Sequence, residues 1–132
     1  MPRQQAPART DPLAHPDPHT AAQAATVENL LRCWLRETDA PTPEHGVLRV
    51  PLPASGTALL VPVRYWSPTG WHRLGAPWLA DAPRPGRPVD AVTLAALLAR
   101  EAPGATETAA VDLVARVADS VRRTAVFIGD RR

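Results

Sequence analysis

The spacing of apolar residues changes once along this chain and then changes back, and this change restricts the fold more than any other feature. Between residues 47 and 74 the apolar side chains alternate, which is typical of β-strands. On both sides they recur every three or four residues, which is typical of helices. We therefore expect an α+β fold: an amphipathic helix, a three-stranded antiparallel meander, a short helix and a long C-terminal helix, after a disordered N-terminal tail.

The alternating region divides into strands at 47–52, 57–66 and 71–74, joined by a Pro-Ala-Ser-Gly turn and a Ser-Pro-Thr-Gly type I turn. Pro51 and Pro62 have no amide hydrogen to donate, so each should lie at an unpaired edge or at a bulge. The side chains expected to share a face are Leu48, Val50 and Leu52 on the first strand, and Leu59, Val61, Val63 and Tyr65 on the second.

The first helix should begin at Thr20, with Gln23 completing a capping box, and should end in the proline-rich segment after residue 37. Glu28 and Arg32 lie off the apolar face in a favourable i, i+4 order. We interpret Cys33 as a small buried hydrophobic residue and not as a reactive thiol. The apolar face comprises Val27, Leu30, Leu31, Trp34 and Leu35.

Two further helices follow the strands. Asp90 should cap the second, with Val89 and Leu94 packed as a hydrophobic staple, and Pro103-Gly104 should end it. The third should run from about Glu107 to Ile128. Five valines lower its intrinsic helix propensity, so it depends on packing against a partner. Its repeating apolar positions are Val114, Val117, Val121, Ala125 and Ile128.

Residues 1–19 hold five prolines and little that can be buried, so we expect a disordered tail, followed by one partial α+β domain over 20–132. The tail contains His15, Asp17 and His19, but no scaffold there supplies further ligands, so we assign no metal site.

The charge balance does not favour nucleic-acid binding. The chain has 15 Arg, no Lys and 13 acidic residues, for a net charge of +2, and the arginines form no basic run. No apolar stretch approaches the length of a membrane span, and no hydrophobic leader opens the chain. We therefore expect a cytoplasmic protein with no membrane partner.

The sequence assigns no catalytic, cofactor-binding or metal-binding residue. The seven glycines are scattered and Lys is absent, which excludes a Walker phosphate loop. Ser55, Ser67 and Ser120 lack the context of an activated nucleophile, and Asp112 and Asp119 are typical of a solvated helix surface.

One aromatic and basic cluster allows two interpretations. His72 and Arg73 beside Trp71 would form a stacking platform for a base or a clamp for a carboxylate. The interpretation we favour is that three tryptophans cover one side of the sheet while the arginines lie in solvent. These residues are Trp66, Trp71, Trp78, Arg64 and Arg73.

Two stretches are more distinctive than a generic pattern. They are Val27-Glu-Asn-Leu-Leu-Arg-Cys-Trp-Leu-Arg-Glu37 and Leu52-Pro-Ala-Ser-Gly-Thr-Ala-Leu-Leu-Val-Pro-Val-Arg-Tyr-Trp-Ser-Pro-Thr-Gly-Trp-His-Arg73. Both resemble the N-terminal region of the siderophore synthetases that work without a nonribosomal assembly line, the aerobactin-synthetase-like (IucA/IucC) family. Residues 111–124 are similar to the family's segment that leads into its nucleotide site.

The resemblance implies a ligase that uses ATP and Mg²⁺ to adenylate a carboxylate of citrate or a similar acid, after which an amine, hydroxylamine or alcohol displaces AMP. In the family the ATP-contacting residues lie downstream of this region, so none is carried onto a position here. We expect the chain to be the N-terminal portion of such a synthetase, inactive alone, with the remainder of the synthetase as its partner.

Two other hypotheses stay open. The chain would instead be a freestanding interaction module, docking or self-associating through its apolar third helix with Val117, Val121 and Ile128 at the centre. Weak RNA or DNA binding that falls steeply with salt is the other hypothesis. The arginines that it would use are Arg64, Arg73, Arg84 and Arg87.

Overall fold

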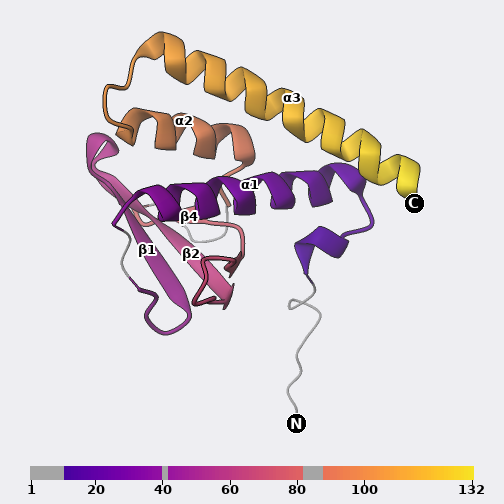
Figure 1. The fold of residues 1–132 in the computed structure, drawn as a ribbon, viewed down its shortest axis with the longest axis horizontal. Coiled ribbons are helices and arrows are strands. Elements are labelled where there is room, and N and C mark those ends of the chain that lie inside the picture. The colour runs from indigo at the N-terminus through magenta and orange to yellow at the C-terminus, as the bar shows by residue number, and fades with distance from the viewer. Residues whose placement is uncertain (1–10, 40–41, 82–87) are drawn as a thin grey trace.

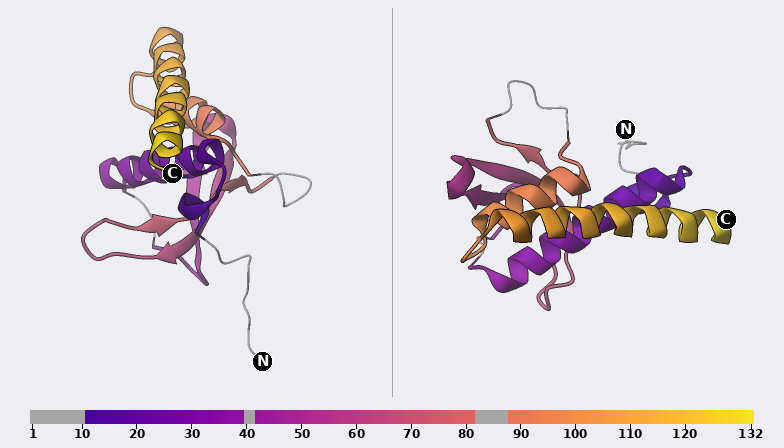
Figure 2. Two further views of the ribbon diagram at one scale, coloured as in Figure 1. Left: turned by 90° about the vertical axis from the view of Figure 1, so that its right-hand side faces the viewer. Right: turned by 90° about the horizontal axis from the view of Figure 1, so that it is seen from above.

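The computed structural model describes residues 11–39, 42–81 and 88–132, and it shows the expected α+β class (Figure 1). An antiparallel sheet forms one layer. Helices α1 (Pro18–Glu37) and α2 (Ala91–Glu101) pack together beside it, and α3 (Glu107–Arg131) lies across the outside of both helices (Figure 2). The three expected helices are therefore present, in the expected order.

The hydrophobic core lies between the sheet and the two inner helices. Leu31 of α1 and Leu94 of α2 are fully buried there, as are the strand leucines Leu48 and Leu59. Burying each such side chain is worth about 1.5–3 kcal/mol relative to leaving it exposed. Alanines also fill the core, and their small side chains allow the helix backbones to approach closely. The fully buried ones on the helices are Ala22, Ala91 and Ala95.

The hairpin has the predicted turn and the predicted buried face. Strands β1 (Val47–Leu52) and β2 (Thr57–Tyr65) pair antiparallel, with Val50 opposite Leu59. The turn is a short 3₁₀ segment, η3 (Pro53–Ser55), closed by Gly56 in the left-handed conformation at φ 71°, which glycine adopts without strain. The expected face residues are buried up to Val61, whereas Tyr65 at the end of β2 is exposed.

The third strand differs from the prediction because it is interrupted. It consists of β3 (Arg73–Leu74) and β4 (Trp78–Leu79), and both pair with β2. Tyr65 pairs with Arg73, and Leu60 pairs with Trp78. The two pairs are five residues apart on β2 and also five residues apart on the segment 73–78.

Pro62 accounts for the interruption. It has no amide hydrogen to offer to the third strand, and the segment between β3 and β4 passes at this point. Gly75 donates its amide to the carbonyl of Pro62 at 2.8 Å. A Cβ at Gly75 would lie 3.3 Å from Pro62 Cβ, so glycine permits the close passage. The prediction that Pro62 lies at an irregularity is confirmed.

Pro51 lies on β1, the strand at the other edge of the sheet. Of the three β1 residues whose backbone groups point away from β2, Val47 exchanges two hydrogen bonds with Glu44, at 2.9 and 3.0 Å, and Pro51 has no amide hydrogen. Among the described residues, the backbone amide of Arg49 is thus the one N–H on this edge of the sheet that no neighbouring strand pairs.

The expected tail boundary is wrong for residues 11–19. Pro12–Ala14 form a 3₁₀ turn, η2, and α1 begins at Pro18 with Asp17, not Thr20, as its cap. The Asp17 carboxylate accepts the amide of Thr20 at 3.0 Å. Gln23 is not part of a capping box, because its side-chain oxygen accepts the amide of Ala91 at 3.0 Å and so links α1 to the start of α2. Residues 1–10 lie outside the described residues.

The cap of α2 is the predicted one, and α3 is capped by a residue that the sequence analysis did not single out. Asp90 accepts the amide of Thr93 at 2.7 Å, and Val89 and Leu94 are both buried in the core, as the staple predicted. Helix α2 ends at Glu101, just before Pro103-Gly104. Thr106 caps α3 by accepting the amide of Ala109 at 3.1 Å.

Two predictions about helix faces are corrected. Cys33 is exposed, because it lies two residues beyond Leu31, and residues at that spacing point to different sides of a helix. Val117 and Val121 of α3 are buried within the chain, so they cannot form the centre of an exposed docking face. Within the described residues, no helix combines the length and apolar character needed to cross a membrane.

Candidate functional site

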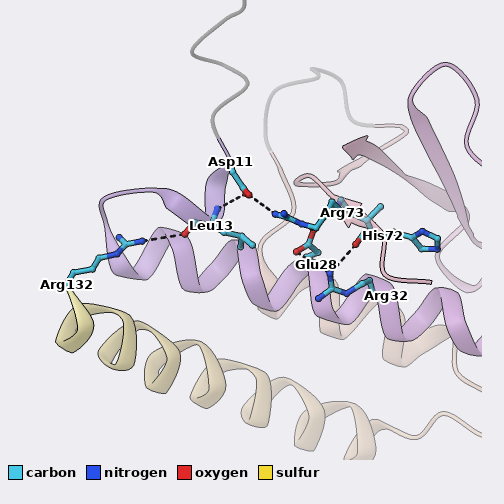
Figure 3. Close-up of polar contacts among 8 residues, drawn as sticks. Asp11, Leu13, Glu28, Arg32, His72, Arg73 and Arg132 are labelled. Atoms are coloured by element: carbon cyan, nitrogen blue, oxygen red, sulfur yellow. Dashed lines mark hydrogen bonds and ion pairs between the residues drawn. The ribbon is translucent and has the colours of Figure 1, made fainter. Parts of the chain in front are cut away.

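The candidate site is built around Glu28, a carboxylate of α1 that is only 3% exposed (Figure 3). Its Oε2 accepts the Nε–H of Arg73 at 2.8 Å and the backbone N–H of Leu74 at 2.7 Å. Its Oε1 lies 3.5 Å from Nη1 of Arg32, one turn further along α1. A buried carboxylate is tolerated only when it is paired and hydrogen-bonded, and Glu28 meets both conditions.

Arg73 connects this carboxylate to the N-terminal strap, the name used here for residues 11–17. The Nη2 of Arg73 donates to Oδ2 of Asp11 at 2.8 Å, while Oδ1 of Asp11 accepts the amide of Leu13. Hydrogen bonds to Asp11 and Glu28 raise the pKa of Arg73. Burial alone would raise the pKa of Asp11, but the hydrogen bonds from Arg73 and Leu13, with the charges of Arg73 and Arg64, lower it overall.

The other end of the strap is held by Arg132. Its guanidinium donates to the carbonyls of His15 and Pro16, the latter at 3.1 Å. It also donates to the carbonyl of Leu13 at 3.4 Å (Figure 3). The strap therefore bridges β3 and the end of α3, two elements that are far apart in the sequence.

An aromatic pair lies on the other side of Arg32. The ring of His72 stacks on Trp66 with centroids 3.6 Å apart, and its Nδ1 accepts the amide of Ser67 at 2.9 Å. Arg32 donates to the carbonyl of His72 at 3.1 Å and lies 5.5 Å from the ring centre of Trp71. Burial of the imidazole, followed by the charge of Arg32, lowers the pKa of His72.

A pocket of about 260 Å³ adjoins this cluster. The strap forms one wall, α1 a second, residues 73–76 a third, and residues 88–90 a fourth. Most of the lining is apolar, and the Arg73 guanidinium reaches it beside Asp11 and Glu28. Apolar walls with a few oriented polar groups are the usual make-up of a small-molecule site.

The cluster proposed from sequence is partly assembled and partly wrong. His72 is buried and Arg73 is paired, so they do not form an open clamp, and Trp71 is 64% exposed and covers little of the sheet. His15 and Asp17 make local backbone contacts instead of a metal site. Among the described residues, no three His, Cys, Asp or Glu side chains are placed to hold a metal ion. Arg84 and Arg87 lie outside the described residues.

The sequence interpretation missed Glu28 and Asp11. The position of Glu28 carried a signal, because Leu31 and Leu35 follow it by three and seven residues, the spacing of one helix face. Asp11 carried none, since its partner is 62 residues away.

We expect Glu28→Gln to reduce the free energy of unfolding by about 1.5–3 kcal/mol, because an amide of the same shape keeps an acceptor but loses the charged bond to Arg73. Urea denaturation measures the change. Asp119→Asn removes an exposed carboxylate on α3 that pairs with Arg122 and Arg123, and as the matched control it should change stability by less than about 0.5 kcal/mol. Equal effects of the two substitutions would contradict the role given to Glu28.

We also expect acid destabilisation that depends on His72. Because its folded-state pKa lies below the ordinary value of 6.5, the unfolded chain takes up the proton first. The contribution of neutral His72 to the free energy of unfolding is therefore complete above about pH 6.5, and it is lost as the pH falls through the folded-state pKa. His72→Gln should reduce the dependence of the unfolding free energy on pH between about pH 7.5 and pH 5. His19→Gln, an exposed control, should leave it unchanged, and the same slope in all three proteins would refute the assignment.

Comparison of the chain with protein families, with curated proteins and with solved structures found no match in any of the three. The cluster around Arg73 and the adjoining pocket are thus features described from this chain alone.

Proposed function

We propose that this chain is the N-terminal part of a cytoplasmic siderophore synthetase that joins citrate or a similar carboxylate to an amine or hydroxyl through an acyl-adenylate. The sequence resemblance of residues 27–37 and 52–73 supports the proposal. One structural observation adds to it: these two stretches contact each other directly, through the bonds from Arg73 to Glu28 and from Arg32 to the carbonyl of His72. The segments that carry the resemblance therefore form one structural unit.

The described residues do not fit an ATP–Mg²⁺ site. Mg²⁺ prefers carboxylate and water oxygens in octahedral geometry, whereas the carboxylates of Glu28 and Asp11 are bonded to arginine. The guanidiniums of Arg32 and Arg73 are engaged in turn, so neither is available for triphosphate without breaking these bonds. We assign no step of adenylation to this chain, and the proposal places that step in the remainder of the synthetase.

The test compares the 132-residue chain with the same chain extended by the codons that follow Arg132 in its gene. With citrate, ATP, Mg²⁺ and hydroxylamine, the 132-residue chain should release no AMP, because the part of it that the structure describes forms no phosphate or metal cradle. The extended protein should release AMP and form a hydroxamate that ferric iron reveals by its colour.

Two outcomes would contradict the proposal. One is citrate-dependent AMP release by the 132-residue chain. The other is an extended protein that forms no hydroxamate with citrate or with other di- and tricarboxylates.

A second candidate function is a protein-interaction module that self-associates through the outer face of α3. The observation that favours it is the exposure of large apolar side chains there: Val126 is 63% and Phe127 is 57% exposed. This surface differs from the one expected from sequence, because Val117 and Val121 are buried in the chain. Exposed apolar patches often mark contacts between proteins.

Light scattering at rising protein concentration tests this second function. The chain should dimerise, and Phe127→Ser should weaken the dimer about tenfold or more, because a large apolar side chain is lost from the contact. Tyr65→Ser is the matched control, since Tyr65 is equally exposed at 57% but lies on β2. A monomer at all concentrations, or an equal effect of both substitutions, would exclude self-association through α3.

A further inference from the structure

The pocket beside Arg73 has the features of a binding site, and the proposed synthetase function does not require it. Its apolar walls include Leu13 of the strap, Val27 of α1, Leu74 of β3 and Val89 at the start of α2. One end carries the guanidinium of Arg73, whose orientation is fixed because Glu28 accepts its Nε–H at 2.8 Å. An apolar cavity with an immobilised cation at one end selects a ligand with an apolar body and a single negative group.

Asp11 now occupies the position that such a negative group would take. Its Oδ2 accepts from Nη2 of Arg73 at 2.8 Å, and its Oδ1 is used by the amide of Leu13. Asp11 thus accepts a single hydrogen bond from Arg73, whereas a free carboxylate can accept two from one guanidinium, one on each oxygen. The Arg73 and Asp11 side chains are each about one-third exposed, and such partly exposed ion pairs hold their partners weakly.

The charge around this end of the pocket favours an anion. Asp11 and Glu28 are the carboxylates, and three guanidiniums act on them. These are Arg73, which bonds to both, Arg32, which lies 3.5 Å from Glu28, and Arg64, whose charge helps to lower the pKa of Asp11. Asp90, a further carboxylate of the lining, caps α2 through the amide of Thr93. Without the Asp11 carboxylate, Glu28 and Asp90 remain as the carboxylates of the lining, and Nη2 of Arg73 loses the acceptor that Asp11 provides.

The side chain of Asp11 can leave Arg73 while the rest of the strap stays in place, held by Arg132. The 3₁₀ turn that follows Asp11, η2, contains no buried residue. As far as the described contacts go, the strap's side-chain bond to the sheet side of the molecule is the one that Asp11 accepts from Arg73. A ligand that replaces Asp11 therefore breaks a surface contact and leaves the hydrophobic core intact.

We propose that this pocket binds a small monocarboxylate with an aromatic or branched apolar body, whose carboxylate displaces Asp11 from the Nη2 edge of Arg73. The apolar body lies against Val27 and Leu74, and Asp11 acts as a built-in competitor. The inference goes beyond the synthetase function and does not depend on it, since the acid is bound and not activated.

Benzoate is the probe, titrated into the ¹⁵N-labelled chain while amide resonances are followed by NMR. Saturable shifts should centre on Leu13, Val27 and Leu74. Asp11→Asn keeps the acceptor that caps Leu13 but removes the competing charge, so benzoate should bind about tenfold more tightly. The matched control is Asp119→Asn, which removes an exposed carboxylate of α3 that is far from Asp11 in the sequence. This variant should bind benzoate with the same affinity as the unaltered chain.

Two ligand controls and two pocket variants complete the test. Benzamide, the neutral analogue, and benzylamine, the cationic one, should bind at least about tenfold more weakly than benzoate, because neither pairs with a guanidinium. Arg73→Gln should abolish binding. If that variant does not fold, Ala24→Leu, which fills the pocket from α1, should abolish binding in its place.

The proposal is overturned by any of three results: benzoate binding no tighter than benzamide or benzylamine, equal benzoate affinities in Asp11→Asn and Asp119→Asn, or shifts centred outside the pocket. None of these results depends on AMP release, so failure here is distinguishable from failure of the synthetase proposal.

Discussion

The structure depends on one buried carboxylate. Glu28 would cost several kcal/mol if it were left unpaired in the core, and its partners come from β3, on the far side of the hairpin: the amide of Leu74 and the guanidinium of Arg73. These bonds fix how α1 lies against the third strand. Because the same guanidinium also holds Asp11, the strap is positioned by a group that is itself positioned by Glu28. A helix, a strand and the N-terminal segment thus share one polar centre.

The outer helix depends on the layer beneath it. Helix α3 buries only Val117 and Val121 fully, and it packs along both α1 and α2. A valine-rich helix with so narrow a buried stripe has little stability of its own. It lies on the outside of the two inner helices, where it contacts both. The long C-terminal helix therefore adds two valines to the core and depends on the inner helices for its stability.

Features that depend on local interactions could be predicted from the sequence, whereas features that depend on distant residues could not. The turn between β1 and β2, the cap of α2 and the irregularity at Pro62 are encoded within a few residues of each other, and they are as expected. The strap, the cap at Asp17 and the burial of Glu28 were missed or misplaced. Two of these depend on partners more than 40 residues away. Gln23 shows the same limit: a plausible local cap instead spans 68 residues to Ala91.

The same limit applies to the candidate site. His72 and Arg73 were recognised as unusual neighbours, but alternation alone could not show that His72 turns inward onto Trp66 while Arg73 meets α1. Trp71 was expected to cover the sheet, yet it is exposed beside Arg32. Side-chain direction in a short, interrupted strand is set by the tertiary contacts that interrupt it. Periodicity carries no record of those contacts.

The outer edge of β1 determines how copies of this chain can meet. Sheets extend from one molecule to another when a row of free amides and carbonyls accepts a new strand. On β1 that row is broken at Val47, which Glu44 already pairs, and at Pro51, which cannot donate. The charged side chain of Arg49 stands between them. The addition of a strand from another molecule, which can lead to amyloid-like aggregation, is therefore disfavoured at this edge of the sheet.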